Sequence, residues 1–203
     1  MRLSRSLLSA LLRGLGLRGR IAFIIAALIA AAWAWLQPPS APPARPGPGM
    51  YTLDGRIVRV ADGDTVTMKT ATGQHRIRLA SIDAPETGHG NDQPGQPFGQ
   101  PARDNLAALV AGRTLVARCY EQDRYGRDIC DLPLPDGQTA NRKQVADGFA
   151  WANTVRRGEY LRDKSLPAIQ QQAQAAGKGM WAERGKSVPP WQWRQDCWKE
   201  RRC

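Results

Sequence analysis

Residues 51–86 read YTLDGRIVRVADGDTVTMKTATGQHRIRLASIDAPE. Three runs in this stretch are short and rich in Val, Ile, Thr and Leu, and turn formers separate them, so each run predicts a β-strand. The runs are 51–60, 64–70 and 74–80. In the third run Arg76 and Arg78 alternate with Ile77 and Leu79, which places both arginines on one face of the strand. We therefore expect the folded domain to begin with three consecutive strands.

The remaining predicted elements mix strands with helices. Two further strand signals, at 114–120 and 128–133, predict a hairpin around the turn 123–127. Helix signals lie at 101–111, near 139–147 and at 167–176. Five strands with about three helices form an α+β pattern, and their lengths suit a small closed barrel with helices packed on it. The last stretch, 189–203, is aromatic and basic and has no clear period.

The positive charge of the chain is unevenly distributed. With 29 basic and 18 acidic residues, the net charge is +11. Six arginines and no acidic residue lie in 1–49, which hold +6, so 50–203 hold 23 − 18 = +5. A basic chain favours a polyanion partner, either nucleic acid or anionic lipid. More than half of this charge, however, lies outside the predicted domain.

An apolar run at 21–36, IAFIIAALIAAAWAWL, follows five of those arginines. As a helix its 16 residues would span roughly 24 Å, just short of a hydrocarbon core of about 30 Å. Arginines before the run, and Trp33 and Trp35 at its end, predict a cytoplasmic N-terminus and export of the rest of the chain. An N-terminal membrane-targeting helix is therefore expected to precede the barrel.

Three explanations of this apolar run stay open. The 20 residues that precede it favour a signal anchor that stays attached, whereas Ala32–Ala34 offers the small-x-small pattern of a cleaved secretory signal. The third is a buried helix of a soluble protein. Either of the first two places the domain in the cell envelope. It would be anchored in the inner membrane and face the periplasm or the exterior, or it would be secreted if the signal is cleaved.

The composition divides the chain into four parts. Six prolines in 37–49 exclude a helix or a sheet strand there and predict an extended spacer. The predicted parts are a signal anchor or signal peptide (1–36), a Pro-rich linker (37–50), the barrel domain (51–195) and a Cys-containing tail (196–203).

All four cysteines lie in the part predicted to be exported: Cys119, Cys130, Cys197 and Cys203. An even number of cysteines outside the cytosol favours two disulfides. The close pairs are Cys119–Cys130, across the predicted hairpin, and Cys197–Cys203. The sequence alone does not fix the connectivity, and four reduced buried thiols are the alternative.

Carboxylates cluster at the ends of neighbouring predicted strands. Asp62 and Asp64 lie at a turn that enters the second strand, and Asp83 and Glu86 follow the third. With no histidine or cysteine beside them, they suit a hard cation with oxygen ligands, Ca²⁺ or Mg²⁺. Because a residue before proline is biased toward extended geometry, the Ala84 carbonyl could also point at the cation. Taken alone, each motif is more simply explained as ordinary turn chemistry than as a catalytic site.

Two arginines accompany these carboxylates. Arg78 lies on the third predicted strand, five residues before Asp83, and Arg127 lies in the hairpin turn. Guanidinium groups bind phosphate bidentately and stay charged, so this combination suits phosphoryl transfer. Each arginine alone could instead be a solvated surface residue.

Together, VADGDTV (60–66), RIRLASIDAPE (76–86) and DRYGR (123–127) resemble the staphylococcal-nuclease-like (thermonuclease) family, with the three blocks in the family's order. The resemblance covers roughly residues 52–193. It implies a five-stranded OB-type β-barrel with three helices. The activity that it implies is Ca²⁺-dependent hydrolysis of DNA and RNA, leaving 5′-hydroxyl and 3′-phosphate ends.

The resemblance also implies residue roles. Asp64, Asp83 and the Ala84 backbone carbonyl look like the metal ligands, for Ca²⁺ rather than Mg²⁺. Glu86 looks like the general base, and Arg78 and Arg127 look like the catalytic phosphate clamps. Asp62 and Thr65 would lie just outside the metal ligands. Arg124 and Tyr125 would lie near the bound nucleotide.

Two other functions are compatible with parts of the sequence. A catalytically silent OB module could bind single-stranded nucleic acid through aromatic side chains and a basic groove, but it would be free to lose Glu86, Arg78 or Arg127. A structural envelope protein could use its basic patch on lipid. The expected partners are DNA and RNA substrates, and the membrane if the N-terminal helix is uncleaved. Nothing in the sequence calls for an obligate protein partner.

Overall fold

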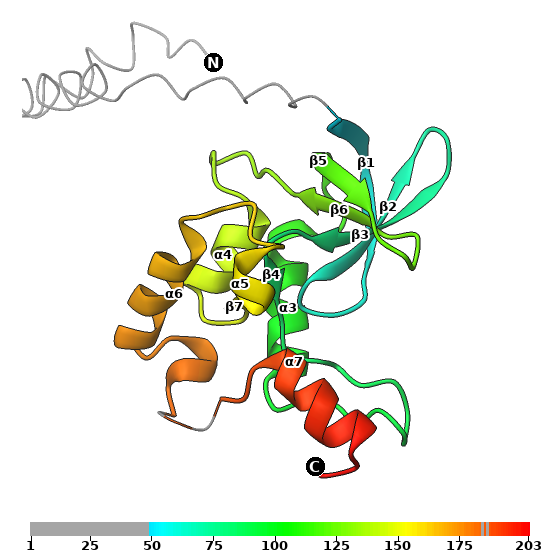
Figure 1. Ribbon diagram of the computed structural model, residues 1–203. Coiled ribbons are helices and arrows are strands. Elements are labelled where there is room, and N and C mark those ends of the chain that lie inside the picture. The colour runs from blue at the N-terminus through cyan, green and yellow to red at the C-terminus, as the bar shows by residue number, and fades with distance from the viewer. Residues whose placement is uncertain (1–48, 184, 186) are drawn as a thin grey trace, which may run out of the picture. The chain divides into compact units, whose positions relative to one another are not determined.

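Five strands close into a barrel with the order β1–β2–β3–β6–β5 (Figure 1). The computed structural model describes residues 49–183, 185 and 187–203. The barrel strands are β1 (Tyr51–Val60), β2 (Thr65–Thr70), β3 (Gln74–Leu79), β5 (Thr114–Gln122) and β6 (Asp128–Asp131). All neighbours are antiparallel except β3 and β6, which run parallel. The predicted five-stranded OB-type barrel is confirmed.

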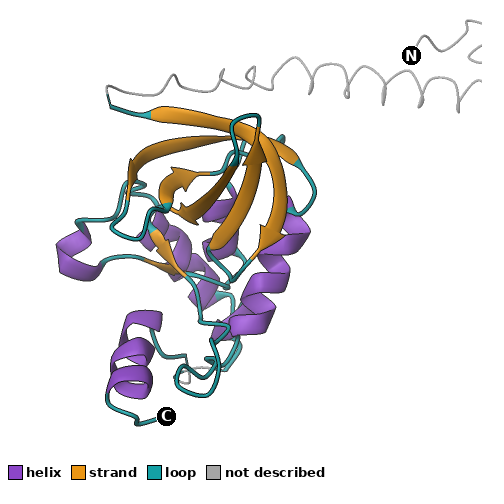
Figure 2. Ribbon diagram, turned by 90° about the vertical axis from the view of Figure 1, so that its right-hand side faces the viewer, coloured by secondary structure: helices purple, strands orange, loops and turns teal. Residues whose placement is uncertain are grey.

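Three longer helices accompany the barrel where helices are predicted. They are α3 (Gly99–Val110), α4 (Ala140–Ala146) and α6 (Leu166–Ala175). In Figures 1 and 2 the strands lie together at the top of the view and these helices lie below and beside them. The α4 helix packs against both α3 and α6. The predicted α+β class is therefore confirmed.

Several short elements are absent from the prediction. A two-stranded sheet pairs β4 (Ile82–Asp83) with β7 (Trp151–Ala152), and two-residue strands are too short to show a period. The other short elements are α5 (Val155–Gly158), η1 (Gly179–Trp181), α7 (Pro190–Trp193) and the π-helix η2 (Arg194–Lys199). The η2 helix crosses position 196, where the sequence suggests the start of a separate tail.

The barrel core is built by the alternation seen in the sequence. On β3, Ile77 and Leu79 are buried, while Arg76 is exposed on the opposite face beside a half-buried Arg78. The α3 helix adds Ala102, Leu106 and Val110 to the same core, because these positions recur on one helical face. The barrel and α3 thus share one hydrophobic interior.

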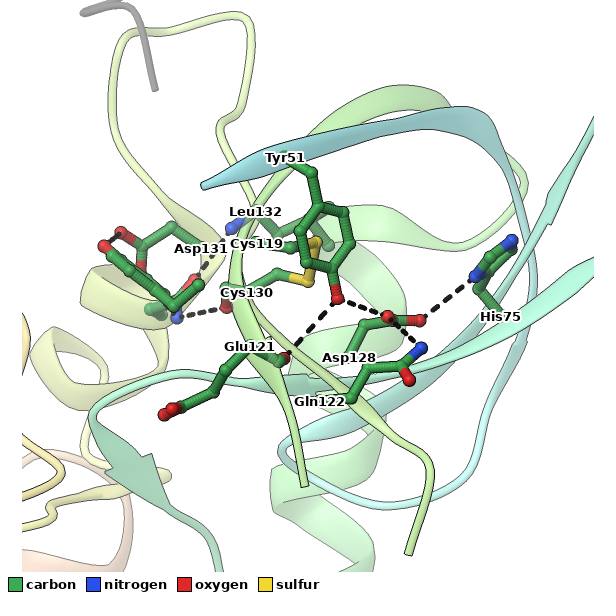
Figure 3. Close-up of a disulfide and its surroundings, with 11 residues drawn as sticks. Tyr51, His75, Cys119, Glu121, Gln122, Asp128, Cys130, Asp131 and Leu132 are labelled. Carbon is green, nitrogen blue, oxygen red and sulfur yellow. Dashed lines mark hydrogen bonds and ion pairs between the residues drawn. A yellow bond between two sulfur atoms is a disulfide. The ribbon is translucent and has the colours of Figure 1, made fainter. Parts of the chain in front are cut away.

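Both disulfides join the cysteine pairs that lie close in sequence. Cys119 and Cys130 face each other across β5 and β6, are buried, and form a disulfide with 4.0 Å between their Cα atoms (Figure 3). Beside this disulfide, Tyr51 and His75 both contact the Asp128 carboxylate. The second disulfide, Cys197–Cys203, closes the end of the chain on η2.

The predicted N-terminal membrane helix lies outside the described residues. Among residues 49–183, 185 and 187–203, no helix is long and apolar enough to cross a bilayer. The run 21–36 and most of the Pro-rich linker are not covered by that statement. Signal anchoring therefore stays a prediction.

Candidate active site

The turn between β1 and β2 is pressed against the helices. Gln144 of α4 donates a hydrogen bond to the Gly63 carbonyl at 2.6 Å. A Cβ placed on Gly63 would lie 2.7 Å from the Ala84 Cβ, so only glycine allows this close approach. The glycine lies between Asp62 and Asp64, and the contact fixes the position of both carboxylates.

The Asp64 carboxylate is buried, and both of its oxygens accept hydrogen bonds. Its Oδ1 accepts hydrogen bonds from Arg78 and, at 3.0 Å, from the Thr65 hydroxyl. Its Oδ2 accepts the Ala84 N–H at 2.9 Å. The Asp64 N–H in turn donates to Asp62 Oδ1 at 3.0 Å. Asp62, Asp64, Thr65 and Ala84, which were predicted to lie around a cation, are therefore close together in the structure.

Strand register brings Arg78 between two carboxylates. Arg78 pairs with Thr65 across β2 and β3, which places its side chain beside Asp64. After β3 the chain reverses at Ser81, whose φ is 68°, and β4 then carries Asp83 back toward Arg78. The Arg78 Nη2 lies 2.7 Å from Asp83 Oδ1. Arg78 thus forms ion pairs with both Asp64 and Asp83.

Glu86 completes the carboxylate cluster, which we define as Asp64, Asp83 and Glu86. Its backbone carbonyl accepts the Gln96 N–H at 2.8 Å. The backbone of Gly99 passes so close that a Cβ there would lie 2.1 Å from that carbonyl oxygen. The Glu86 side chain is 14% exposed. The start of α3 therefore fixes Glu86 at the edge of solvent.

The structure adds a residue that sequence analysis missed, Arg194. Its Nη1 lies 2.5 Å from Glu86 Oε1 and 3.1 Å from Asp83 Oδ1, and its Nη2 lies 2.7 Å from Asp83 Oδ2. Arg194 lies in the aromatic and basic stretch that has no period, 108 residues from Glu86. No local sequence pattern predicts a contact between Arg194 and Glu86. The one available signal is that Arg194 lies in a stretch rich in tryptophan.

Burial and neighbouring charges shift the pKa values of the three carboxylates in different directions. Burial is the main cause that raises the pKa of Asp64, to about 7; Arg78 opposes this rise, and the neighbouring Asp62 and Asp83 add to it. Burial also raises the pKa of Glu86, with Asp64 adding to the effect. Burial alone would raise the pKa of Asp83, but Arg78 and Arg194 hold it below its usual range. The site thus combines the three carboxylates of the cluster with two guanidinium groups, those of Arg78 and Arg194.

The oxygen atoms of this cluster suit a hard cation. Asp64 Oδ2 accepts the Ala84 N–H, and Asp83 Oδ2 accepts Arg194 Nη2, so each oxygen keeps a lone-pair direction for a metal ion. No group of three His, Cys, Asp or Glu side chains in the described part of the chain is arranged to hold a metal ion. The expected ligands are instead two carboxylates and the Ala84 carbonyl, an all-oxygen set typical of Ca²⁺ or Mg²⁺ sites that also use water.

The hairpin turn holds its arginines apart from the cluster. Arg127 forms its ion pair with Asp123, whose Oδ2 lies 2.7 Å from Arg127 Nη2. Arg124 donates to the Tyr125 hydroxyl at 2.7 Å and lies over the Tyr125 ring. Tyr125 is 64% exposed, so this turn presents an aromatic ring and Arg124 to solvent, while Arg127 is half-buried. The structure does not pair Arg127 with Asp64, Asp83 or Glu86.

The sequence is similar to nucleases of several organisms. Residues 76–183 match the family described as "Staphylococcal nuclease homologue". An "Uncharacterized endonuclease" of Escherichia coli O157:H7 is 37% identical over 142 residues, which are 70% of this chain and 85% of that protein. A "Micrococcal nuclease" of Shigella flexneri is 33% identical over 156 residues, 73% of this chain and 84% of that protein. An "Uncharacterized endonuclease" of Haemophilus influenzae is 34% identical over 141 residues, 69% and 72% of the two chains.

Proposed function

The chain belongs to the staphylococcal nuclease homologue family, and from that premise we propose that it is an endonuclease that hydrolyses phosphodiester bonds of DNA and RNA. We propose further that the reaction depends on Ca²⁺ and leaves 5′-hydroxyl and 3′-phosphate ends. The observation that carries the proposal is the convergence of Asp64, Asp83 and Glu86 on Arg78 and Arg194 at one end of the barrel. A module that only binds nucleic acid has no use for a buried carboxylate cluster.

Asp64 Oδ2, Asp83 Oδ2 and the Ala84 carbonyl would hold the cation. A bound Ca²⁺ would neutralise charge that develops on the phosphate oxygens. Arg78 would act on the same oxygens, because a guanidinium has five N–H donors and only one on each terminal nitrogen is used on Asp64 and Asp83.

Glu86 would accept the proton of the attacking water. Its raised pKa makes its carboxylate a stronger base than an ordinary exposed glutamate. As the water oxygen bonds to phosphorus, the bond from phosphorus to the 5′-oxygen breaks. The released 5′-oxygen takes a proton from solvent, which gives the 5′-hydroxyl and 3′-phosphate ends.

Arg127 would clamp a second phosphate oxygen only after a rearrangement. Its guanidinium forms an ion pair with Asp123, whose carboxylate also accepts the N–H groups of Tyr125 and Arg127. This arrangement keeps the turn ordered while Tyr125 and Arg124 remain available to a nucleotide base. We propose that substrate phosphate draws Arg127 away from Asp123.

The test is cleavage of end-labelled DNA and RNA oligonucleotides by the purified full chain. We expect cutting with Ca²⁺, less with Mg²⁺, and none after chelation. The new ends should accept phosphate from a 5′-kinase without prior dephosphorylation. Binding without cutting in all three conditions would support the silent module. Cutting that leaves 5′-phosphate would overturn the proposed bond cleavage.

We also propose that the domain acts outside the cytoplasm. Two disulfides in a domain of this size favour an oxidising compartment, and they agree with the expected N-terminal anchor. Fractionation of expressing cells should place the chain with the envelope or outside, with all four cysteines resistant to alkylation until a reductant is added. Reduced protein in the cytoplasm would contradict export.

A further inference from the structure

The C-terminal segment, which we define as residues 187–203, contacts the active site through Arg194. Figure 1 shows its helix in red below β4 and beside the green loop that precedes α3. We call this loop, residues 87–97, the connecting loop. The carboxylate cluster lies between residues 64 and 86, in the turn before β2, in β4 and in the loop after β4, so a side chain of the C-terminal segment is an addition to it.

Tryptophans dock this segment on the connecting loop. The indole N–H groups of Trp193 and Trp198 both donate to the Pro94 carbonyl, at 3.3 and 2.9 Å. On the other side, Gln96 donates from Nε2 to the Val188 carbonyl at 2.6 Å. These bonds fix the segment before and after Arg194, so the direction of that side chain is determined by its surroundings.

Two further contacts brace the segment. The Trp191 ring lies edge-on to the Trp151 ring with centroids 5.9 Å apart, and Trp151 is the β7 partner of Asp83. The Cys197–Cys203 disulfide ties the end of the chain to η2, and Cys197 is buried. The segment is thus held by the same small sheet that carries one of the carboxylates.

We propose that Arg194 is a positioning residue of this active site, which holds the Glu86 and Asp83 carboxylates at a fixed separation for hydrolysis. The inference rests on the proposed nuclease function. The Arg194 guanidinium contacts both oxygens of Asp83 and one oxygen of Glu86, and its side chain is only 31% exposed. A planar guanidinium fork can bridge two carboxylates in this way, whereas a lysine ammonium offers a single point of charge.

The opposite role is physically conceivable, because a guanidinium could fill the place of the cation and block it. Hydrogen-bond geometry favours positioning. Each of Asp64 Oδ2 and Asp83 Oδ2 keeps one lone-pair direction while Arg194 is in place, so metal and arginine can share the cluster. Removing a positioning arginine slows hydrolysis, and removing a blocking arginine speeds it. The sign of the change therefore decides between them.

The experiment compares Arg194→Ala, Arg194→Lys and Arg202→Ala in the full chain. Arg202 is a matched control, because it lies in the same segment and its ion pairs are with Asp196 and Glu200 rather than with the cluster. We expect Arg194→Ala to lower kcat by about 10-fold to 100-fold, with KM nearly unchanged. Arg194→Lys should fall between Arg194→Ala and wild type, and Arg202→Ala should cut like the wild type.

Calorimetric Ca²⁺ titration of the same variants gives a readout that does not depend on turnover. Loss of the Arg194 charge should tighten Ca²⁺ binding by about tenfold. If Arg194 is a positioning residue, Arg194→Ala should bind Ca²⁺ more tightly and hydrolyse nucleic acid more slowly. If its role were merely structural, both the Ca²⁺ affinity and the rate of hydrolysis would fall. If it blocked the cation, both would rise.

Hydrolysis by Arg194→Ala at the wild-type rate or faster would overturn the inference. Thermal unfolding shows whether that variant folds. If it does not fold, Arg194→Lys decides, and an unchanged kcat in that variant would overturn the inference. A wild-type chain that does not cut would refute the proposed function and the inference together, whereas cutting by wild type and Arg194→Ala alike would refute the inference alone.

Discussion

The barrel and the C-terminal segment both supply the active site, but they hold their residues in different ways. Asp64, Arg78 and Asp83 are placed by strand register and by backbone that packs into the common core. Arg194 is placed by tryptophan hydrogen bonds to one carbonyl and by a small disulfide loop. Changes to Asp64, Arg78 or Asp83 should therefore disturb both folding and catalysis, whereas changes in the C-terminal segment should disturb catalysis alone.

The largest combined effect on catalysis and folding is expected at Arg78. Arg78→Ala should lower kcat by about 10²–10³-fold, the loss expected for one charge-stabilising donor. It should also lower the free energy of unfolding by about 3–5 kcal/mol, because Asp64 and Asp83 would be left buried without their shared partner. Cleavage assays and urea unfolding measure the two effects. A variant that loses activity but keeps full stability would break the proposed contrast.

The two disulfides give a second comparison of the barrel with the C-terminal segment. Their removal should have a smaller effect than Arg78→Ala. Replacing Cys119 and Cys130 by alanine should lower the free energy of unfolding by about 3 kcal/mol, since the crosslink lies in the barrel core. At 25 °C the kcat of this variant should stay near that of wild type.

Replacing Cys197 and Cys203 by alanine should instead lower kcat and leave the stability of the barrel nearly unchanged. Loosening of the segment should lower kcat by up to about tenfold through misplacement of Arg194, with little change in the main unfolding transition. Chemical unfolding and steady-state cleavage of the two double variants, run side by side, test the pair of expectations. Equal stability losses in the two variants would show that the segment unfolds with the barrel.

The smallest effect is expected at Asp128, on the barrel and away from the site. Burial alone would raise the pKa of Asp128, but hydrogen bonds from Tyr51, Gln122 and His75 together lower it below its usual range. A lowered folded-state pKa adds stability above the unfolded pKa near 4, and that stability is lost as the pH falls through the folded value.

Asp128→Asn should therefore cost about 2 kcal/mol at pH 7, and this difference should shrink below about pH 4. Urea unfolding at both pH values measures it, with the exposed Asp54→Asn as control. A difference that does not depend on pH would contradict the assignment of the stabilisation to the ionised carboxylate.

Sequence reasoning succeeded where the determinants are local. Alternation on β3 placed Arg78 opposite Ile77 and Leu79, and turn formers placed Asp64 at the start of β2. Hairpin geometry favoured the Cys119–Cys130 pairing. Each of these follows from neighbours within a few residues, or from the pairing of consecutive strands.

It failed where the determinants are distant. Arg194 reaches Glu86 only because tryptophans bind a loop about a hundred residues earlier in the chain, at Pro94. The pairing of Asp83 with Trp151 involves strands too short to show alternation. Arg127 was expected beside the phosphate but pairs with Asp123 in its own turn, so its role as a clamp stays a prediction.

The central claim is that the carboxylate cluster at the end of the barrel cuts nucleic acid internally. The most direct measurement is cleavage of circular single-stranded DNA, which has no ends, by wild type and Glu86→Ala with Ca²⁺. We predict that wild type opens and fragments the circle, and that Glu86→Ala is about 10²–10⁴-fold slower while its thermal unfolding is preserved. A Glu86→Ala variant that opens the circle at the wild-type rate would contradict the claim.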